Sequence, residues 1–265
     1  MIKLIASDLD GSLLDEHKNF PPGFFDLLKR LKQRGITFVA ASGRSYVTLA
    51  KNFSQAGNDI DFICDNGACV VEHGRMTYQN VIQSNQLKEI IRACKPIPNI
   101  KLVLCGVHGT YHLPYDEKFD FEISSYYINH VLMDDLMDVQ DDIFKVAICD
   151  LSNPVNNAYP VLNQRFGEEL SVIVSGPVWM DLMNIGVNKG VALAKIQEHL
   201  GVTPEETMAF GDFYNDIELL AQAHYSFVME NANDDMKQYG NFIAKSNREH
   251  GVMKAIEEYV FQKKA

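Results

Sequence analysis

Short apolar runs alternate with amphipathic, helix-like segments at both ends of this 265-residue chain, and this alternation limits the possible folds more than any other feature. The segment GFFDLLKRLKQRG, between two apolar runs, places its apolar residues on one face of a helix. The expected strands at this end are IKLIAS, ITFVAAS and DFICDN. Strands that alternate with helices predict a parallel sheet. The same rhythm returns near the C-terminus in NKGVALAKIQEHLG, TMAFGD, NDIELLAQA, YSFVME and a closing helix near 249 to 263.

Residues 84–186 interrupt this rhythm. Adjacent short strands such as SVIVSG and VWMDLMN indicate an antiparallel sheet with helices on one face, and one of these helices is expected near 116 to 132. The fold class predicted is therefore α/β, with a doubly wound, Rossmann-like parallel-sheet core and an inserted α+β cap domain. Residues 1–83 and 187–265 would form the core, and residues 84–186 would form the cap.

Composition excludes several classes of function. A hydrophobic content of 46% with 22% charged residues is typical of a globular protein, and a net charge of -11 argues against a broad nucleic-acid-binding face. Neither a signal peptide nor an apolar stretch long enough to span a membrane is found, which predicts a cytoplasmic protein without a membrane partner. The five cysteines are odd in number and lie near apolar segments, so we expect reduced, packed thiols. The sequence makes no prediction of oligomeric state.

Polar residues gather where the predicted core strands end. In doubly wound sheets, ligands bind beyond the carboxyl ends of the strands. Asp8 and Asp10 lie two residues apart, so both carboxylates leave the end of the first strand on the same side. Such charges require neutralisation, and Mg²⁺ is a suitable partner, although an acidic loop after an ordinary strand is the alternative. The other polar residues at strand ends are Ser42, Gly43, Arg44, Asn66, Gly67, Asp212, Asn215 and Asp216.

Two further features favour an anion at the same edge. Ser42 and Gly43 offer a hydroxyl and backbone N–H groups where a helix begins. Lys189 follows a possible N-cap at Asn188 and places an ammonium at another helix start. Each feature alone has an ordinary structural explanation as a turn, a solvated lysine or a cap. Their common position at strand ends favours a site for phosphate and a metal ion.

The sequence resembles a known family at these positions. The segments DLDGSLL, ASGR, Lys189 in NKG, and GDFYND resemble, in order, the four signature motifs of haloacid dehalogenase-like phosphatases. DNGA before the insertion and HGV near the C-terminus resemble the Cof-like subfamily IIB of sugar phosphatases, whose members carry a cap between the second and third motifs. The cap resembles the family in position and size. One departure is Ser12, where many family members have Thr, but a hydroxyl is retained.

The resemblance implies a role for each residue in this list. Asp8 would be the nucleophile and Asp10 the general acid and base. Mg²⁺ would be bound by the Asp8 carboxylate, the Asp10 main-chain carbonyl and Asp212. Phosphate would be held by Ser42, Gly43, Lys189 and Asn215, with support from Arg44, Asn66, Gly67 and Asp216. The implied activity is Mg²⁺-dependent hydrolysis of small phosphomonoesters, in particular sugar phosphates, through an aspartyl-phosphate.

Two other functions fit parts of this pattern. A phosphomutase of the same superfamily would share the core, and a response-regulator-like signalling module would also place carboxylates and a lysine at strand ends. The Asp8 and Asp10 pair and the large insertion favour a substrate-enclosing enzyme over a signalling module. The natural substrate is not predicted. Cap residues that could contact substrate, or serve only the structure, are His108, Tyr111, His112, Trp179, Asp181 and Asn184.

Overall fold

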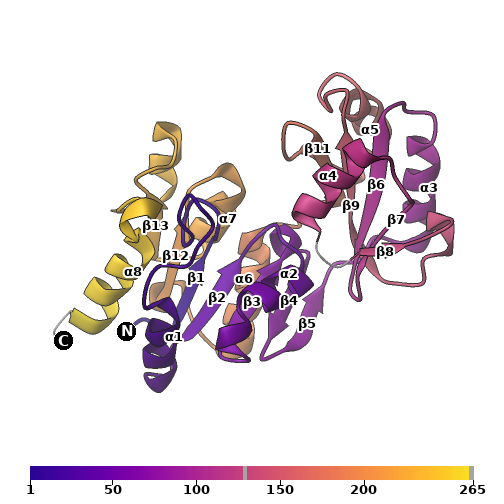
Figure 1. Ribbon diagram of the computed structural model, residues 1–265. Coiled ribbons are helices and arrows are strands. Elements are labelled where there is room, and N and C mark those ends of the chain that lie inside the picture. Colours follow the sequence, from indigo (N-terminus) through magenta and orange to yellow (C-terminus); the bar gives the residue numbers. More distant parts are fainter. Residues whose placement is uncertain (128–129, 263–265) are drawn as a thin grey trace. The chain divides into compact units, whose positions relative to one another are not determined.

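The computed structural model describes residues 1–127 and 130–262 and divides the chain into two compact units (Figure 1). The core unit contains both ends of the chain, Met1–Tyr78 and Asn188–Ala265, and the inserted unit is Gln79–Val187. The unit boundaries therefore fall at 78/79 and 187/188, against 83/84 and 186/187 in the sequence analysis.

Within the described residues, the core unit has one eight-stranded sheet with the order β14-β13-β12-β1-β2-β3-β4-β5. The pairs from β14 to β3 are parallel, and β3 pairs with β4 in antiparallel fashion. Because β1 lies between β12 and β2, the carboxyl ends of these three strands meet at one edge of the sheet. The strands are β1 (Leu4–Ser7), β2 (Thr37–Ala41), β3 (Asp61–Cys64), β4 (Cys69–Glu72), β5 (Arg75–Gln79), β12 (Thr207–Gly211), β13 (Tyr225–Met229) and β14 (Phe242–Ala244).

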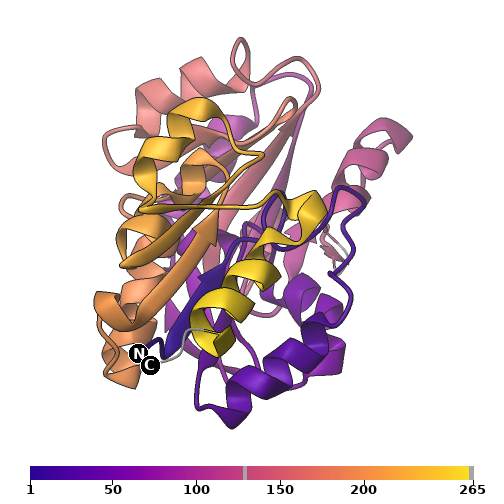
Figure 2. The same ribbon diagram turned by 90° about the vertical axis from the view of Figure 1, so that its left-hand side faces the viewer.

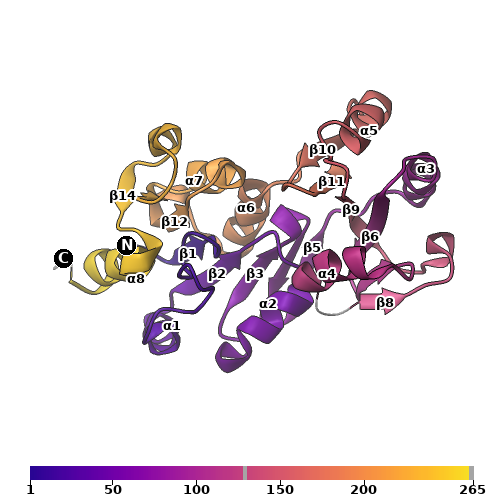
Figure 3. The same ribbon diagram turned by 45° about the horizontal axis from the view of Figure 1, so that its top comes forward.

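Helices cover both faces of the core sheet, as Figures 2 and 3 show. One face carries α1 (Phe24–Gln33), α2 (Tyr46–Asn52) and α8 (Gly251–Ile256), and the other carries α6 (Lys189–Leu200) and α7 (Ile217–Ala221). Leu4 of β1 and Leu193 of α6 belong to one buried apolar cluster, and burial of such a side chain contributes about 1.5–3 kcal/mol. The closing helix differs from expectation, because α8 ends at Ile256 and a π-helical segment, Glu257–Gln262, follows it.

Within the described residues, the inserted unit has a six-stranded sheet with the order β10-β11-β9-β6-β7-β8. Its pairs are antiparallel except for β7 with β8. The helices α3 (Ser84–Cys94) and α5 (Ala158–Phe166) bury their apolar residues against one face. The strands are β6 (Ile100–Gly106), β7 (Thr110–His112), β8 (His130–Leu132), β9 (Ile143–Asp150), β10 (Leu170–Val174) and β11 (Trp179–Asn184).

Two expectations for the inserted unit were wrong. The helix expected near 116 to 132 is α4 (Glu117–Tyr126), and residues 128–129 of that prediction lie outside the described residues. His130–Leu132 forms β8 because these residues pair with Thr110–His112, a contact that local periodicity does not reveal. Helices were expected on one face only, but α4 lies on the face opposite α3 and α5 (Figure 3). Phe119 and Ile123 of α4 are buried, so this helix adds a second set of apolar contacts within the inserted unit.

Two other expectations concern cysteines and membrane spans. All five cysteines are free and buried, so the prediction of packed, reduced thiols is confirmed. In the part of the chain that the structure describes, no helix has the length and hydropathy needed to cross a bilayer.

Candidate active site

The site is built at the carboxyl ends of the central core strands. Ser7, the last residue of β1, pairs with Ala40 of β2 and Phe210 of β12, which brings the three following loops together. Asp8 comes next and is only 6% exposed, and its backbone N–H donates to the Phe210 carbonyl. Asp10 lies two residues further on, with its side chain 48% exposed. The two carboxylates therefore occupy different environments at one strand end.

The loop after β1 approaches Asp212 closely. Gly11 has a φ of +91°, and a Cβ at this position would lie 2.2 Å from Asp212 Oδ2, so both conformation and space require glycine. The hydroxyl of Ser12 donates to Asp212 Oδ1 at 3.1 Å. The Ser12 hydroxyl, a group that threonine would also supply at this position, therefore orients a carboxylate of the site.

Lys189 joins two of the carboxylates. Its ammonium donates to Asp8 Oδ1 and to Asp216 Oδ1, each at 2.6 Å, and the side chain is fully buried. The preceding residue, Asn188, is the N-cap of α6 and accepts a hydrogen bond from the Val191 N–H, which fixes the start of the helix.

Asp216 holds this arrangement in place. Its second oxygen, Oδ2, accepts hydrogen bonds from the backbone N–H groups of Asp212 at 3.1 Å and Phe213 at 3.2 Å. Asp216 is fully buried, and it fixes both Lys189 and the loop that carries Asp212. This residue was expected only to support the site, but it lies inside the charged cluster.

Burial and mutual repulsion shift the pKa values of the cluster. Burial raises the pKa of Asp8. The charge of Lys189 opposes this rise, and the charges of Asp216 and Asp212 add to it. Burial, with the charge of Asp216, raises the pKa of Asp212 to about 6. Burial alone would lower the pKa of Lys189, but Asp216 and Asp8 outweigh burial and raise it. Three carboxylates around one ammonium carry excess negative charge when ionised, and such a group attracts a cation.

These residues fit a divalent cation. Ligand oxygens of Asp8, Asp212 and Asp216 lie within 4.8 Å of one another. Asp8 Oδ2 is buried and has no hydrogen-bond partner among the described residues. Because the oxygens of Asp216 already accept from Lys189 and backbone N–H groups, Asp8 and Asp212 are the carboxylates left for a metal. A hard oxygen-ligand set of this kind suits Mg²⁺.

The Asp10 carboxylate lies outside this cluster and binds Arg44. Arg44 Nη2 lies 2.5 Å from Asp10 Oδ1, and Arg44 Nε donates to Asp10 Oδ2 at 3.1 Å. The backbone N–H of Arg44 also donates to the Ser42 hydroxyl at 3.2 Å. The Arg44 side chain, expected only to support the site, thereby connects the second motif to the first.

The structure links the residues predicted to bind phosphate. Asn215 donates from its amide to Asn66 Oδ1 at 3.1 Å, and a Cβ at Gly43 would lie 3.2 Å from the Asn66 amide. Gly67 has a φ of +100°, and a Cβ there would lie 2.2 Å from the Asn188 carbonyl. The end of β3 therefore lies against the start of α6, where Lys189 begins the helix.

One residue near the site, Asn231, was not among the predicted site residues. The Asn231 amide donates to the Gly11 carbonyl at 2.8 Å and so holds the loop after β1. Asn231 lies just beyond β13, at the same edge of the sheet as the other polar residues. Its position after a core strand was the available signal.

The candidate residues of the inserted unit make contacts within that unit. His108 and Tyr111 both bind Asp141, at 2.8 and 3.0 Å. Asn184 donates to the Val81 carbonyl at 3.0 Å. These three bonds are structural contacts. The other three candidates, all buried, are His112, Trp179 and Asp181.

Comparisons with known proteins identify the family of this chain and relatives of similar fold. The model of the haloacid dehalogenase-like hydrolase family matches residues 5–256. A 5-amino-6-(5-phospho-D-ribitylamino)uracil phosphatase of Escherichia coli is 30% identical over 97% of this chain and 96% of its own, and one of Bacillus subtilis is 26% identical over 98% and 96%. A haloacid dehalogenase-like hydrolase from Bacteroides thetaiotaomicron, whose crystal structure is known, is 26% identical in sequence to this chain. The two structures superpose with a TM-score of 0.85 over 97% of this chain and 99% of the other. The predicted fold class is confirmed.

Proposed function

Because this chain belongs to the haloacid dehalogenase-like hydrolases and is a phosphatase, we propose that it hydrolyses small phosphomonoesters through an aspartyl-phosphate on Asp8. The observation that carries the proposal is the unequal state of the two Asp8 oxygens. Oδ1 accepts a hydrogen bond from the buried Lys189, and Oδ2 is buried without a hydrogen-bond partner among the described residues. Membership of a hydrolase family also argues against the signalling module considered above.

In the first step, an oxygen of Asp8 attacks phosphorus as the ester P–O bond breaks. Lys189, fixed by Asp216, offsets the negative charge that would keep a carboxylate from a phosphate group. Asp10 gives its proton to the departing alkoxide. In the second step, Asp10 takes a proton from water as that water attacks the aspartyl-phosphate, which releases phosphate and restores Asp8.

We assign the metal and phosphate ligands as follows. Mg²⁺ would be held by the carboxylates of Asp8 and Asp212 and the main-chain carbonyl of Asp10, and when bound it supplies positive charge to the phosphate oxygens. The phosphate oxygens would be bound by Ser42, Gly43, Lys189 and Asn215. The supporting contacts described above are those of Arg44, Asn66, Gly67 and Asp216.

For the substrate, we propose a phosphate ester of a sugar or sugar alcohol. Support comes from the two relatives named above, whose named substrate carries its phosphate on a ribityl chain. We further propose that the inserted unit selects the substrate. Support comes from its place in the chain, because it is inserted between DNGA, which follows β3, and NKG at the start of α6, and both segments carry residues of the site.

A substrate screen tests this function. The purified chain is incubated with 5-amino-6-(5-phospho-D-ribitylamino)uracil, pentose and hexose phosphates, and sugar-alcohol phosphates, with Mg²⁺ or with a chelator. We expect phosphate release that requires Mg²⁺, and a phosphorylated Asp8 peptide after acid quenching. Isomerised sugar phosphate without phosphate release would instead identify a phosphomutase.

Replacement of residues 84–186 by a short linker tests whether the inserted unit selects the substrate. An unchanged preference between two substrates in the truncated protein would contradict that role.

A further inference from the structure

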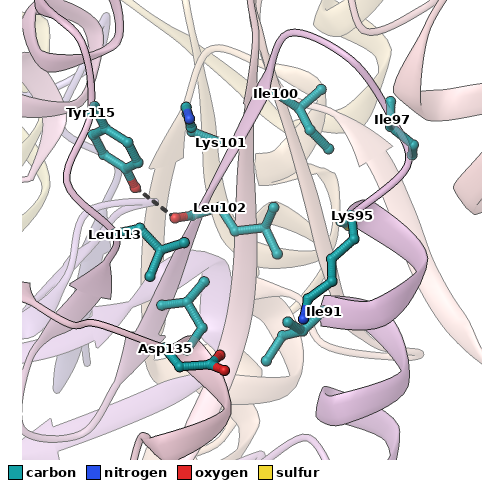
Figure 4. A pocket seen from close by; sticks show the side chains of 11 residues that line it. Ile91, Lys95, Ile97, Ile100, Lys101, Leu102, Leu113, Tyr115 and Asp135 are labelled. Atoms are coloured by element: carbon teal, nitrogen blue, oxygen red, sulfur yellow. Dashed lines mark hydrogen bonds between the residues drawn. The ribbon is translucent and has the colours of Figure 1, made fainter.

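A cavity of about 170 Å³ opens within the inserted unit, on the face of its sheet that carries α3. It lies between the C-terminal end of α3, the strand β6, the segment that follows β7 and the short 3₁₀ turn Leu136–Asp138 (Figure 4). None of the four signature motifs contributes a residue to this cavity. Its apolar lining consists of Ile91, Ile97, Ile100, Leu102, Leu113 and Leu136.

The walls of the cavity are fixed by hydrogen bonds. The Tyr115 hydroxyl donates to the Leu102 carbonyl at 2.7 Å and so holds the segment after β7 against β6 (Figure 4). Asp135 is the N-cap of the 3₁₀ turn, and its Oδ1 accepts from the Met137 N–H at 3.0 Å. A cavity with walls held in this way exists before a ligand arrives, which lowers the entropic cost of binding.

Two opposite charges flank the apolar lining. Lys95 comes from the end of α3 and Asp135 from the start of the 3₁₀ turn, and both are exposed residues that line the cavity. Figure 4 shows both charged side chains beside the same apolar group of residues. Lys101 also lines the cavity, but its ammonium lies 5.8 Å from the Tyr115 ring centre and 5.5 Å from that of Phe119. Lys95 is therefore the cation that we assign to a ligand.

We propose that this cavity binds a free amino acid with a branched apolar side chain, such as leucine. The carboxylate of the amino acid pairs with Lys95, its ammonium pairs with Asp135, and its side chain occupies the apolar part. An apolar cavity of about 150 Å³ holds a benzene molecule, so the size suits an isobutyl group. A ligand with only one of the two charges leaves either Lys95 or Asp135 unmatched.

Calorimetric titration of the full chain tests this proposal. We expect L-leucine to bind saturably and L-alanine to bind at least about tenfold more weakly, because each buried methylene strengthens binding roughly fourfold. The single-charge analogues 4-methylpentanoate and 3-methylbutylamine should bind about two- to fivefold more weakly than leucine, since each loses one contact with an exposed charged side chain. Absence of saturable leucine binding, or equal binding of 4-methylpentanoate, would overturn the proposal.

Matched variants locate the site. Lys95→Gln and Asp135→Asn should each weaken leucine binding by about two- to fivefold, since each removes one charge at an exposed position. Asparagine is as good an N-cap as aspartate, so the second variant should retain the turn. Lys88→Gln and Asp134→Asn alter exposed residues that do not line the cavity and serve as controls. If Lys95→Gln bound leucine as tightly as Lys88→Gln, or Asp135→Asn as tightly as Asp134→Asn, with thermal unfolding unchanged, leucine would not bind in this cavity. Binding is the readout, so its failure leaves the proposed phosphatase function intact.

Discussion

The core unit and the inserted unit each bury a carboxylate at the carboxyl end of a strand, Asp8 after β1 and Asp150 at the end of β9. Asp150 accepts hydrogen bonds from the N–H groups of Ser152 and Ala158 and from the Asn157 amide, so both of its oxygens are bound. Asp8 leaves Oδ2 without a partner among the described residues. A satisfied buried carboxylate holds a loop and a helix in place, and an unsatisfied one retains an oxygen for chemistry or a metal.

The sharpest test of this contrast exchanges each carboxylate for an amide. Asp8→Asn should lower turnover by at least about 10³-fold, because an amide is a poor nucleophile and a weak metal ligand. Asp150→Asn should leave turnover per folded molecule unchanged. Steady-state phosphate release, with circular dichroism to count folded molecules, measures both. Retention of more than about a hundredth of the turnover in Asp8→Asn would exclude this residue as the nucleophile.

A second test separates Asp8 from Asp10. General acid catalysis contributes ~10²–10⁴-fold, so Asp10→Asn should slow enzyme phosphorylation by about that factor with a sugar phosphate. The loss should be far smaller with nitrophenyl phosphate, whose leaving group departs without a proton. Because the second step uses the same residue as base, the variant should release a burst of nitrophenol close to one equivalent of enzyme. Pre-steady-state measurements that show equal losses for both esters and no burst would argue against proton transfer by Asp10.

A third test compares the two units by stability. Lys189→Met leaves Asp8 and Asp216 buried without their shared cation and should cost about 3–5 kcal/mol of unfolding free energy. Asp150→Ala removes the acceptor from several donors in the inserted unit and should cost about 1–3 kcal/mol. Urea unfolding of both variants measures these costs. A smaller loss in Lys189→Met than in Asp150→Ala would show that the charged cluster of the core does not contribute to stability as described.

The smallest expected effect concerns pH in the inserted unit. Burial lowers the pKa of His112, whose Nδ1 lies 2.8 Å from the Leu113 carbonyl and whose ring stacks on Tyr115. The folded state therefore resists protonation that the unfolded state accepts below a pH of about 6.5. The contribution to stability is present above that pH and is lost as the pH falls toward the lowered pKa. Unfolding midpoints between neutral and mildly acidic pH should fall less steeply in His112→Phe, with His17→Gln as a surface control. An identical pH slope in His112→Phe and the parent would contradict this assignment.

Local sequence patterns predicted much of the core but less of the contacts between distant segments. The strands that carry Asp8 and Asp212 were recognisable because a buried parallel strand is an apolar run that ends in polar residues. The strand His130–Leu132 was missed because its pairing with β7 is not encoded in its own periodicity. The motifs predicted which residue types form the site but not their contacts. Asp216 contacts Lys189 and Arg44 contacts Asp10 only because separate loops approach each other in the fold.

The insertion between the two halves of the core has a consequence for how the protein is made. Asp8 and its partner Lys189 are 181 residues apart, and β1 pairs with β12. During synthesis, β1, β2 and β3 leave the ribosome long before β12 can pair with β1, and the inserted unit is complete before that partner arrives. Until β12 is made, the nascent core exposes the unpaired apolar edge of β1, next to Asp8. Because pairing of β1 with β12 joins residues far apart in the chain, we expect this step to be the slow and aggregation-prone part of folding.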